Sequence, residues 1–181
     1  EHVTFDRFFD HTLLHEISHG LGPGTIVKDG EKTEVGKELK ELYSAIEEAK
    51  AATLGMYNAA WLVGKGFYPE PTAEDIWVSF MAGTFRSVRF GADEAHGKAN
   101  VVIFNYLAEK GAYVKEPATG RFTVDLAKIE GAVRDLAHDL LMIEALGEYD
   151  GAKAFLERYG TMSPDMKALV DKVNRSDLWR D

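Results

Sequence analysis

The amino-acid sequence predicts a mainly α-helical protein built from several helices, with one or two small β-hairpins or ordered loops between them. Over long stretches of the 181 residues, apolar side chains recur every three or four positions, as they do along one face of an α-helix. Only two stretches combine β-prone residues with hairpin-like turns. Hydrophobic residues make up 45% of the chain, which is enough for a compact core. No internal repeat or low-complexity linker divides residues 1–181, so we expect one domain.

The first predicted helix runs from about residue 4 to residue 21. Its apolar residues have helical spacing, and the glycines and proline of residues 20–24 end it, because neither residue type continues a helix cheaply. Residues 25–35 consist of two short β-prone runs around Asp-Gly, which is a strong hairpin signal. We therefore expect a small hairpin or an ordered loop that leads from the first helix to the second.

A long second helix is predicted from residue 36 to about residue 64. This stretch is rich in strong helix formers, and its apolar residues again have helical spacing. Two prolines within residues 67–71 break the pattern. Another helix is expected to start at Thr72, where a capping residue is followed by two acids, and to run through Phe85.

The second half of the chain continues the helical pattern. We expect helices over residues 92–110, 125–147, 149–159 and 163–173. The last of them opens with Ser-Pro-Asp, in which proline occupies the first helical position. Residues 111–124 contain β-prone runs separated by a Pro-Ala-Thr-Gly turn, and they are a candidate for a second hairpin.

The sequence His15-Glu16-Ile-Ser-His19, within the first predicted helix, has the pattern of half a zinc site. Residues four apart lie on one helical face with Cβ atoms roughly 5–6 Å apart, so both imidazoles can reach one Zn²⁺. Glu16 projects beside such a metal, where a carboxylate can accept a proton from a bound water. His11 extends the series, but it precedes His19 by about 12 Å of axial rise. We interpret His11 as a neighbour of the site or a packed surface histidine.

Composition restricts the remaining ligand and the partners. A catalytic zinc needs three protein ligands, and the chain has no cysteine, so the third must be His, Asp or Glu. The second predicted helix offers Glu47 and Glu48. A net charge of −9 without a basic run argues against nucleic acid and anionic membranes as partners. No apolar run approaches the ~18 residues of a membrane span, and no signal peptide is visible.

Two further segments extend the zinc motif. Residues 47–51 have the sequence Glu-Glu-Ala-Lys-Ala, and residues 55–57 have the sequence Gly-Met-Tyr. Farther along, residues 94–111 begin with Glu-Ala-His-Gly-Lys and continue as an apolar helical pattern. Together with the His-Glu helix, these segments resemble the dipeptidyl peptidase III family of zinc metallopeptidases, including the related domain fused to some Nudix hydrolases. The resemblance covers three ordered segments and is far more specific than the zinc motif alone.

The resemblance implies a zincin-like catalytic lobe and a role for each of several residues. It implies that His15, His19 and Glu48 bind zinc. It implies that Glu47 orients a ligand histidine. A histidine that stabilises the transition state in the family corresponds to His96. The roles of Glu47, Glu48 and His96 are assigned by the resemblance, because the spacing of residues alone does not decide them.

The chain departs from the family pattern in three places. The best-known members have one more residue between the two histidines, whereas the shorter spacing here keeps good i, i+4 geometry. An acid that often follows the glutamate ligand by four residues is Ala52 here, and a substrate-contacting arginine is Asn100, so substrate preference can differ from the familiar dipeptide release. His11, Lys50 and Asn100 are further candidates for the wall of the cleft.

The expected function is zinc-dependent hydrolysis of peptide bonds in short peptides, with release of N-terminal dipeptides as the mode that the resemblance implies. The alternative is a non-catalytic domain in which zinc staples helices together and the surface binds a peptide or a partner protein. Because the first residue is Glu and the metal helix follows at once, we expect the C-terminal part of a longer, two-lobed protein, whose N-terminal lobe would be its partner. A cytoplasmic location is expected.

Overall fold

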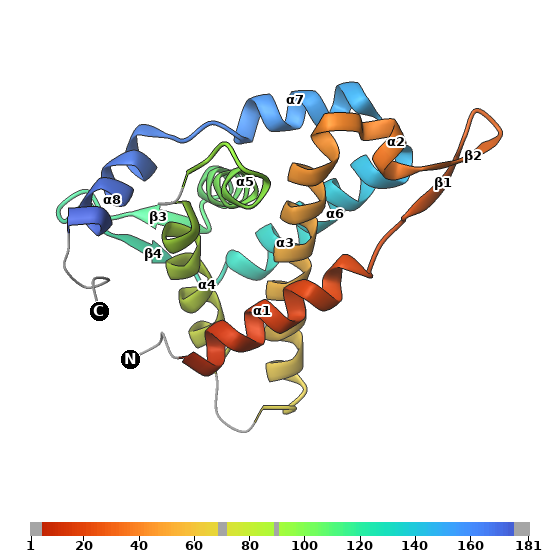
Figure 1. Cartoon of the computed structure of the whole chain (residues 1–181). Coiled ribbons are helices and arrows are strands. Elements are labelled where there is room, and N and C mark those ends of the chain that lie inside the picture. The colour runs from red at the N-terminus through yellow and green to blue at the C-terminus, as the bar shows by residue number, and fades with distance from the viewer. Residues whose placement is uncertain (1–4, 69–71, 89–90, 176–181) are drawn as a thin grey trace.

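The computed structural model describes residues 5–68, 72–88 and 91–175 (Figure 1). It confirms the mainly α architecture with two small antiparallel hairpins. The elements are, in chain order, α1 (Phe5–His19), β1 (Thr25–Lys28), β2 (Glu31–Glu34), α2 (Val35–Leu39), the 3₁₀ turn η1 (Lys40–Leu42), α3 (Tyr43–Gly64), α4 (Ala73–Val88), α5 (Ala95–Glu109), β3 (Tyr113–Lys115), β4 (Phe122–Val124), α6 (Ile129–Leu146), α7 (Tyr149–Tyr159) and α8 (Pro164–Arg175). The predicted helix start at residue 4 and part of the predicted break at residues 67–71 lie outside the described residues.

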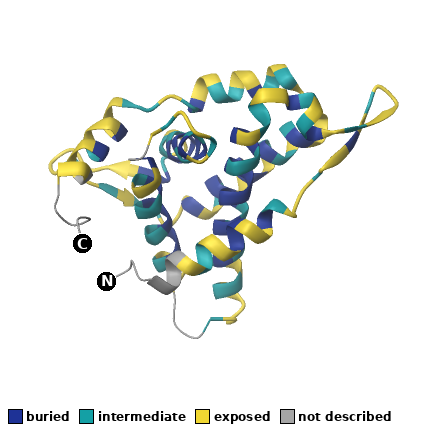
Figure 2. Cartoon of the chain, in the orientation of Figure 1, coloured by how far each residue is buried: buried dark blue, intermediate teal, exposed yellow. Residues whose placement is uncertain are grey.

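Helix α3 is the centre of the fold, and α1, α4, α5 and α6 all pack against it (Figure 1). Its buried side chains are mostly small, which lets the neighbouring helices approach closely. The buried alanines of α3 are Ala45, Ala49, Ala51, Ala52 and Ala59. Helix α5 is the second buried element and contributes larger side chains, among them Phe104, Tyr106 and Leu107 (Figure 2). The core therefore lies between α3, α5 and the helices that pack around them.

The predicted continuous helix over residues 36–64 is wrong in its first part. The structure divides this stretch into α2, the turn η1 and α3. The division falls at Lys40, whose backbone has φ 53° and ψ −130°, so the α-helical hydrogen-bond ladder cannot pass through it. Val35 and Leu39, at the two ends of α2, are fully buried. The change of direction at Lys40 allows both side chains to be buried while α3 runs through the centre of the molecule. Helix propensity does not predict this change of direction.

Both predicted hairpins are confirmed. Strands β1 and β2 pair antiparallel around Asp29 and Gly30, which have φ 53° and 85°, as a turn with two positive φ angles requires. The hairpin projects from the body of the molecule (Figure 1). Lys28 anchors its base, because its Nζ donates to Gly147 O at 2.8 Å and to Glu38 Oε2 at 2.9 Å. Strands β3 and β4 form the second, shorter hairpin.

The ends of several helices follow the capping rules. Thr72 and Asp75 bond reciprocally at the start of α4: the Thr72 backbone N–H donates to Asp75 Oδ2, and the Asp75 N–H donates to Thr72 Oγ1. Ser163 Oγ accepts from the Met166 N–H at the start of α8. Helix α6 ends at Gly147 in the left-handed conformation. Within the described ranges, none of the helices combines the length and the apolar character that crossing a bilayer demands.

Candidate metal centre

The first two donor atoms of the candidate centre come from α1. His15 and His19 are four residues apart, and their rings meet edge to face with centroids 4.7 Å apart. His15 Nε2 and His19 Nε2 lie 3.1 Å from each other. The His15 side chain is 11% exposed and the His19 side chain 30% exposed, so both imidazoles are largely enclosed and His19 is the more accessible. The four-residue spacing therefore brings two ring nitrogen atoms close together, as two ligands of one metal ion would be.

The third donor atom comes from α3. Glu48 Oε2 lies 3.2 Å from His15 Nε2 and 3.9 Å from His19 Nε2. This proximity depends on Gly55, because a Cβ atom at that position would lie 2.9 Å from the backbone nitrogen of His15. A glycine is thus required where α1 crosses α3. The crossing brings the His-Glu helix and the glutamate helix together, as the sequence resemblance implied.

The three donor atoms fit a tetrahedral metal ion. His15, His19 and Glu48 each supply one atom, and these atoms all lie within 4.8 Å of one another. Ligand atoms of a tetrahedral site with bonds of 2.0–2.1 Å are separated by roughly 3.3 Å, close to the spacing found here. Glu48 Oε2 is buried and has no hydrogen-bond partner among the described residues. A cation at this point would satisfy that buried oxygen.

Glu47 lies behind the centre, next to the ligand pair. Its Oε1 accepts a hydrogen bond from His19 Nδ1 at 2.9 Å. With the proton on Nδ1, the lone pair of His19 Nε2 is directed at the other donors, which is how a carboxylate orients a metal-binding histidine. Burial raises the pKa of Glu47, but the neighbouring Glu144, Lys50 and His19 side chains outweigh it and hold that pKa below its ordinary value. Glu47 is therefore an anion.

The predicted location of Lys50 on the wall of the cleft is wrong. Lys50 is 1% exposed. Its Nζ donates to the carbonyl oxygens of Ser18 and Leu21 at 3.2 and 2.7 Å, and to Glu47 Oε1 at 2.9 Å. Lys50 is thus enclosed between α3 and the end of α1.

His96 and Asn100 lie on α5, the third helix of the centre. His96 Nε2 is 3.2 Å from Glu48 Oε2, and its ring stacks on that of His15 with centroids 6.1 Å apart. The His96 side chain is 69% exposed, so it lies on the open side of the donor cluster. Asn100 Nδ2 donates to the carbonyl oxygen of His96 at 2.8 Å. The structure therefore brings His96 next to the candidate donor atoms and places Asn100 one turn behind it.

Two further residues of α1 flank the ligands. Glu16 is exposed on the face next to His15. His11 is packed instead: its ring meets the Phe80 ring at 4.8 Å, and its Nε2 is buried. Burial, with the nearby His15, lowers the pKa of His11 to about 4. His11 is therefore a neutral histidine. It neighbours the centre, and it is also packed, so both interpretations offered for it describe its position.

The chain is similar to known proteins over almost its whole length. No family model matches the chain. The chain superposes over 95% of its length on dipeptidyl peptidase III from Caldithrix abyssi, with a TM-score of 0.92 and 54% sequence identity. The same share superposes on dipeptidyl peptidase III from Corallococcus sp. strain EGB, with a TM-score of 0.91 and 36% identity. Over 175 residues, or 96% of its length, the chain is also 47% identical to Nudix hydrolase 3 of Arabidopsis thaliana.

The chain belongs to the dipeptidyl peptidase III family. It spans 33% and 32% of the two solved relatives and 22% of the Arabidopsis protein. The relation to a Nudix hydrolase agrees with the resemblance to domains of this family that are fused to such enzymes.

Glu144 lies behind this candidate centre and was not predicted from the sequence. It lies on α6, is 1% exposed, and its buried carboxyl group neighbours that of Glu47. Burial, and after it the neighbouring Glu47, raise the pKa of Glu144 to about 8, so it is protonated at neutral pH. A signal was present in the sequence, since Glu144 follows the core residues Leu136 and Leu140 at four-residue spacing and so lies on the core face of α6.

The raised pKa of Glu144 predicts a pH dependence of stability. Its pKa is about 8 when folded and 4.5 ordinarily, so the folded state binds more protons between these values, and stability falls as pH rises through this window. We expect the unfolding midpoint of the metal-free protein to decrease from about pH 6.5 to about pH 8.5, and to decrease less in Glu144→Gln, which cannot ionise. Thermal unfolding of both proteins measures the difference. Parallel profiles would show that Glu144 is already ionised.

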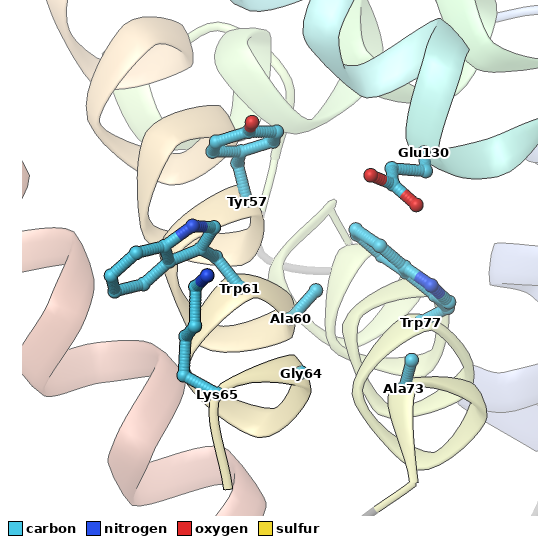
Figure 3. Close-up of a pocket in the computed structure, with 8 residues that line it drawn as sticks. All are labelled: Tyr57, Ala60, Trp61, Gly64, Lys65, Ala73, Trp77 and Glu130. Carbon is cyan, nitrogen blue, oxygen red and sulfur yellow. The ribbon is translucent and has the colours of Figure 1, made fainter. Parts of the chain in front are cut away.

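A separate pocket opens at the far end of α3 (Figure 3). Its volume is about 300 Å³. The lining residues are Tyr57, Ala60, Trp61, Gly64, Lys65, Ala73, Trp77 and Glu130. Tyr57 and Trp61, on α3, lie across from Trp77, on α4, and the Glu130 carboxylate lies above Trp77 in this view (Figure 3). This lining includes none of the metal donors, and it shows that Tyr57 of the Gly-Met-Tyr segment faces this pocket.

Proposed function

We propose that the chain binds Zn²⁺ through His15, His19 and Glu48 and hydrolyses peptide bonds in short peptides. The observation that carries this proposal is the convergence of one oxygen and two nitrogen atoms at the spacing of tetrahedral zinc ligands, in a member of the dipeptidyl peptidase III family. The two solved relatives are named as dipeptidyl peptidases, and the release of N-terminal dipeptides is the mode that their names suggest.

The side chains around the centre have the chemistry that hydrolysis needs. Zinc bound there would supply a Lewis acid for the peptide carbonyl and would lower the pKa of a coordinated water. Glu16, exposed next to His15, accepts the proton of the attacking water and delivers it to the amine that leaves when the C–N bond breaks. His96, on the open side of the cluster, donates a hydrogen bond to the oxygen on which negative charge develops.

We also propose that this chain acts as one lobe of a longer protein, with the substrate between the lobes. The support is that the chain spans about a third of each solved relative. The remaining part of such a protein would supply the opposite wall of the cleft and many of the contacts that select a substrate. Asn100, one turn behind His96, places an amide where the family has an arginine, and this favours a substrate preference of its own.

The test is peptide hydrolysis by the full-length protein before and after removal of zinc. We expect cleavage of short peptides, complete loss of turnover after dialysis against a chelator, and recovery on addition of one equivalent of Zn²⁺. Mass spectrometry of the products shows whether N-terminal dipeptides are released. Turnover that is indifferent to the chelator would contradict the proposal.

The competing function is a non-catalytic domain in which zinc holds α1 and α3 together. A structural zinc site is closed by four protein ligands, whereas a catalytic one keeps a position open. The mutually close donor set found among the described residues has three members, which favours the catalytic reading. Zinc binding without hydrolysis of any peptide in a diverse library, by the full-length protein, would favour the competing function.

A further inference from the structure

A buried group of charged and polar side chains lies directly behind the candidate centre. Lys50 is fully buried on α3, and its Nζ faces the end of α1. Carbonyl groups at the C-terminal end of a helix lack intrahelical partners and carry a partial negative charge. Lys50 supplies these carbonyls with donors, since its Nζ contacts the oxygens of Ser18, His19 and Leu21 at 3.2, 3.5 and 2.7 Å. A side chain of α3 thus caps the helix that carries both histidine ligands.

The same ammonium group also fixes the carboxylate behind His19. Glu47 Oε1 accepts from Lys50 Nζ and from His19 Nδ1, both at 2.9 Å. One oxygen atom is therefore shared between the lysine and the ligand histidine. A carboxylate with a single donor can rotate about its side-chain torsions, but one held between two donors cannot turn without breaking a buried hydrogen bond. The orientation of the His19 ring follows from the position of Glu47, and hence from Lys50.

Lys50 and Glu47 also form a buried ion pair, with Lys50 Nζ 2.9 Å from Glu47 Oε1 and the two side chains 2% and 15% exposed. A buried charge that loses its partner is left uncompensated, which is costly. Removal of the Lys50 ammonium group would therefore release Glu47 from its position behind His19.

We propose that Lys50 is a positioning residue for the metal centre: through Glu47 and the last turn of α1, it holds His19 in the orientation in which Nε2 faces the metal. The inference rests on the metal-binding part of the proposed function and not on peptide hydrolysis. It assigns a functional role to a lysine that contacts none of the three metal-donor atoms and does not lie on the open side of the centre. Lysines in such enclosed positions are rare in proteins, which agrees with a specific role.

The test compares the zinc affinity of three variants with that of the purified wild-type protein, measured by competition with a chromophoric chelator. Lys50→Met keeps an unbranched side chain that is one atom shorter and removes the charge and the donors. We expect it to weaken zinc binding by about 10–100-fold, the usual effect of losing a group that orients a ligand. Lys50→Arg restores charge and donors and should recover most of the affinity. Lys28→Met is the matched control, because Lys28 also bonds a helix-terminal carbonyl and a glutamate, far from the centre.

A merely structural role makes a different prediction. In that case Lys50→Met and Lys28→Met would both lower the unfolding midpoint of the metal-free protein, and neither would change the zinc affinity of the folded protein. That result would overturn the proposal. As a second readout, the visible spectrum of the Co²⁺-loaded protein should change in Lys50→Met and remain unchanged in Lys28→Met, since the spectrum reports the geometry of the ligands.

A double variant covers the case in which Lys50→Met does not fold. Glu47→Gln together with Lys50→Met removes both charges and leaves no unpaired buried ion. If Lys50 acts through Glu47, zinc affinity in the double variant equals that of Glu47→Gln alone, because the two effects are not additive. Additive losses would overturn this route. If the wild-type protein binds no zinc, the proposal falls together with the metal centre; if it binds zinc and cleaves no peptide, only the proposed function falls.

Discussion

Replacing Glu16 with glutamine is expected to lower kcat for peptide hydrolysis by about 10²–10⁴-fold, the usual contribution of a general acid–base group. Glu16 is exposed next to His15 and is not one of the three donors, so zinc content should stay at the wild-type level. The amide of glutamine has the size of the carboxylate but cannot accept the proton of the attacking water. Steady-state kinetics and metal analysis on the same sample separate the two effects.

The control for this variant is Glu157→Gln, which neutralises an exposed glutamate on α7, a helix that carries none of the three donors, and should leave kcat unchanged. A Glu16→Gln protein with wild-type turnover would mean that a different group accepts the proton. A variant that lost its zinc would instead show that Glu16 supports the site itself and would contradict the assignment of a purely catalytic role.

Replacing Glu48 with alanine is expected to weaken zinc binding by about 10³-fold. A zinc site worth roughly 10–16 kcal/mol divides that free energy among its ligands, which leaves about 4 kcal/mol for each. The loss of Oε2 would leave the two nitrogen atoms of α1, 3.1 Å apart, without a third protein donor. Zinc content after dialysis and the dissociation constant from chelator competition measure the effect.

Glu130→Ala provides the comparison, because Glu130 is an exposed glutamate that lines the separate pocket and is not one of the donors. It should bind zinc as the wild type does. Equal zinc affinity in Glu48→Ala and the wild type would show that the third ligand is another residue, and the convergence of the three donors would then be a coincidence of packing.

The sequence predicted one half of the centre from elementary geometry and the other half only by resemblance. The four-residue spacing of His15 and His19 places both on one face of a helix, whatever surrounds it. Which acid of the second helix faces them depends on where α1 crosses α3, and that is decided by tertiary packing. The family resemblance pointed to Glu48, and the structure places Glu48 with the histidines.

The residues behind the centre show why the rest could not be predicted. Lysine is almost always exposed, so residue type favoured a place for Lys50 on the wall of the cleft, whereas the end of α1 encloses it. Glu144 is distant in the sequence from every motif, and only the complete packing of α6 against α3 brings it to Glu47. The helix break at Lys40 likewise depends on tertiary contacts that no local propensity encodes.

The close crossing at Gly55 sets an angular tolerance for the metal centre. The two backbones meet there, at His15, while Glu48 lies seven residues away along α3, or roughly 10 Å. A rotation of one helix against the other by about 1° therefore moves the Glu48 carboxylate by about 0.2 Å relative to His15, which is the whole allowance for a zinc ligand distance. Zinc affinity therefore depends strongly on the angle between α1 and α3. Any substitution or bound molecule that tilts α1 should change the zinc affinity before it changes the fold.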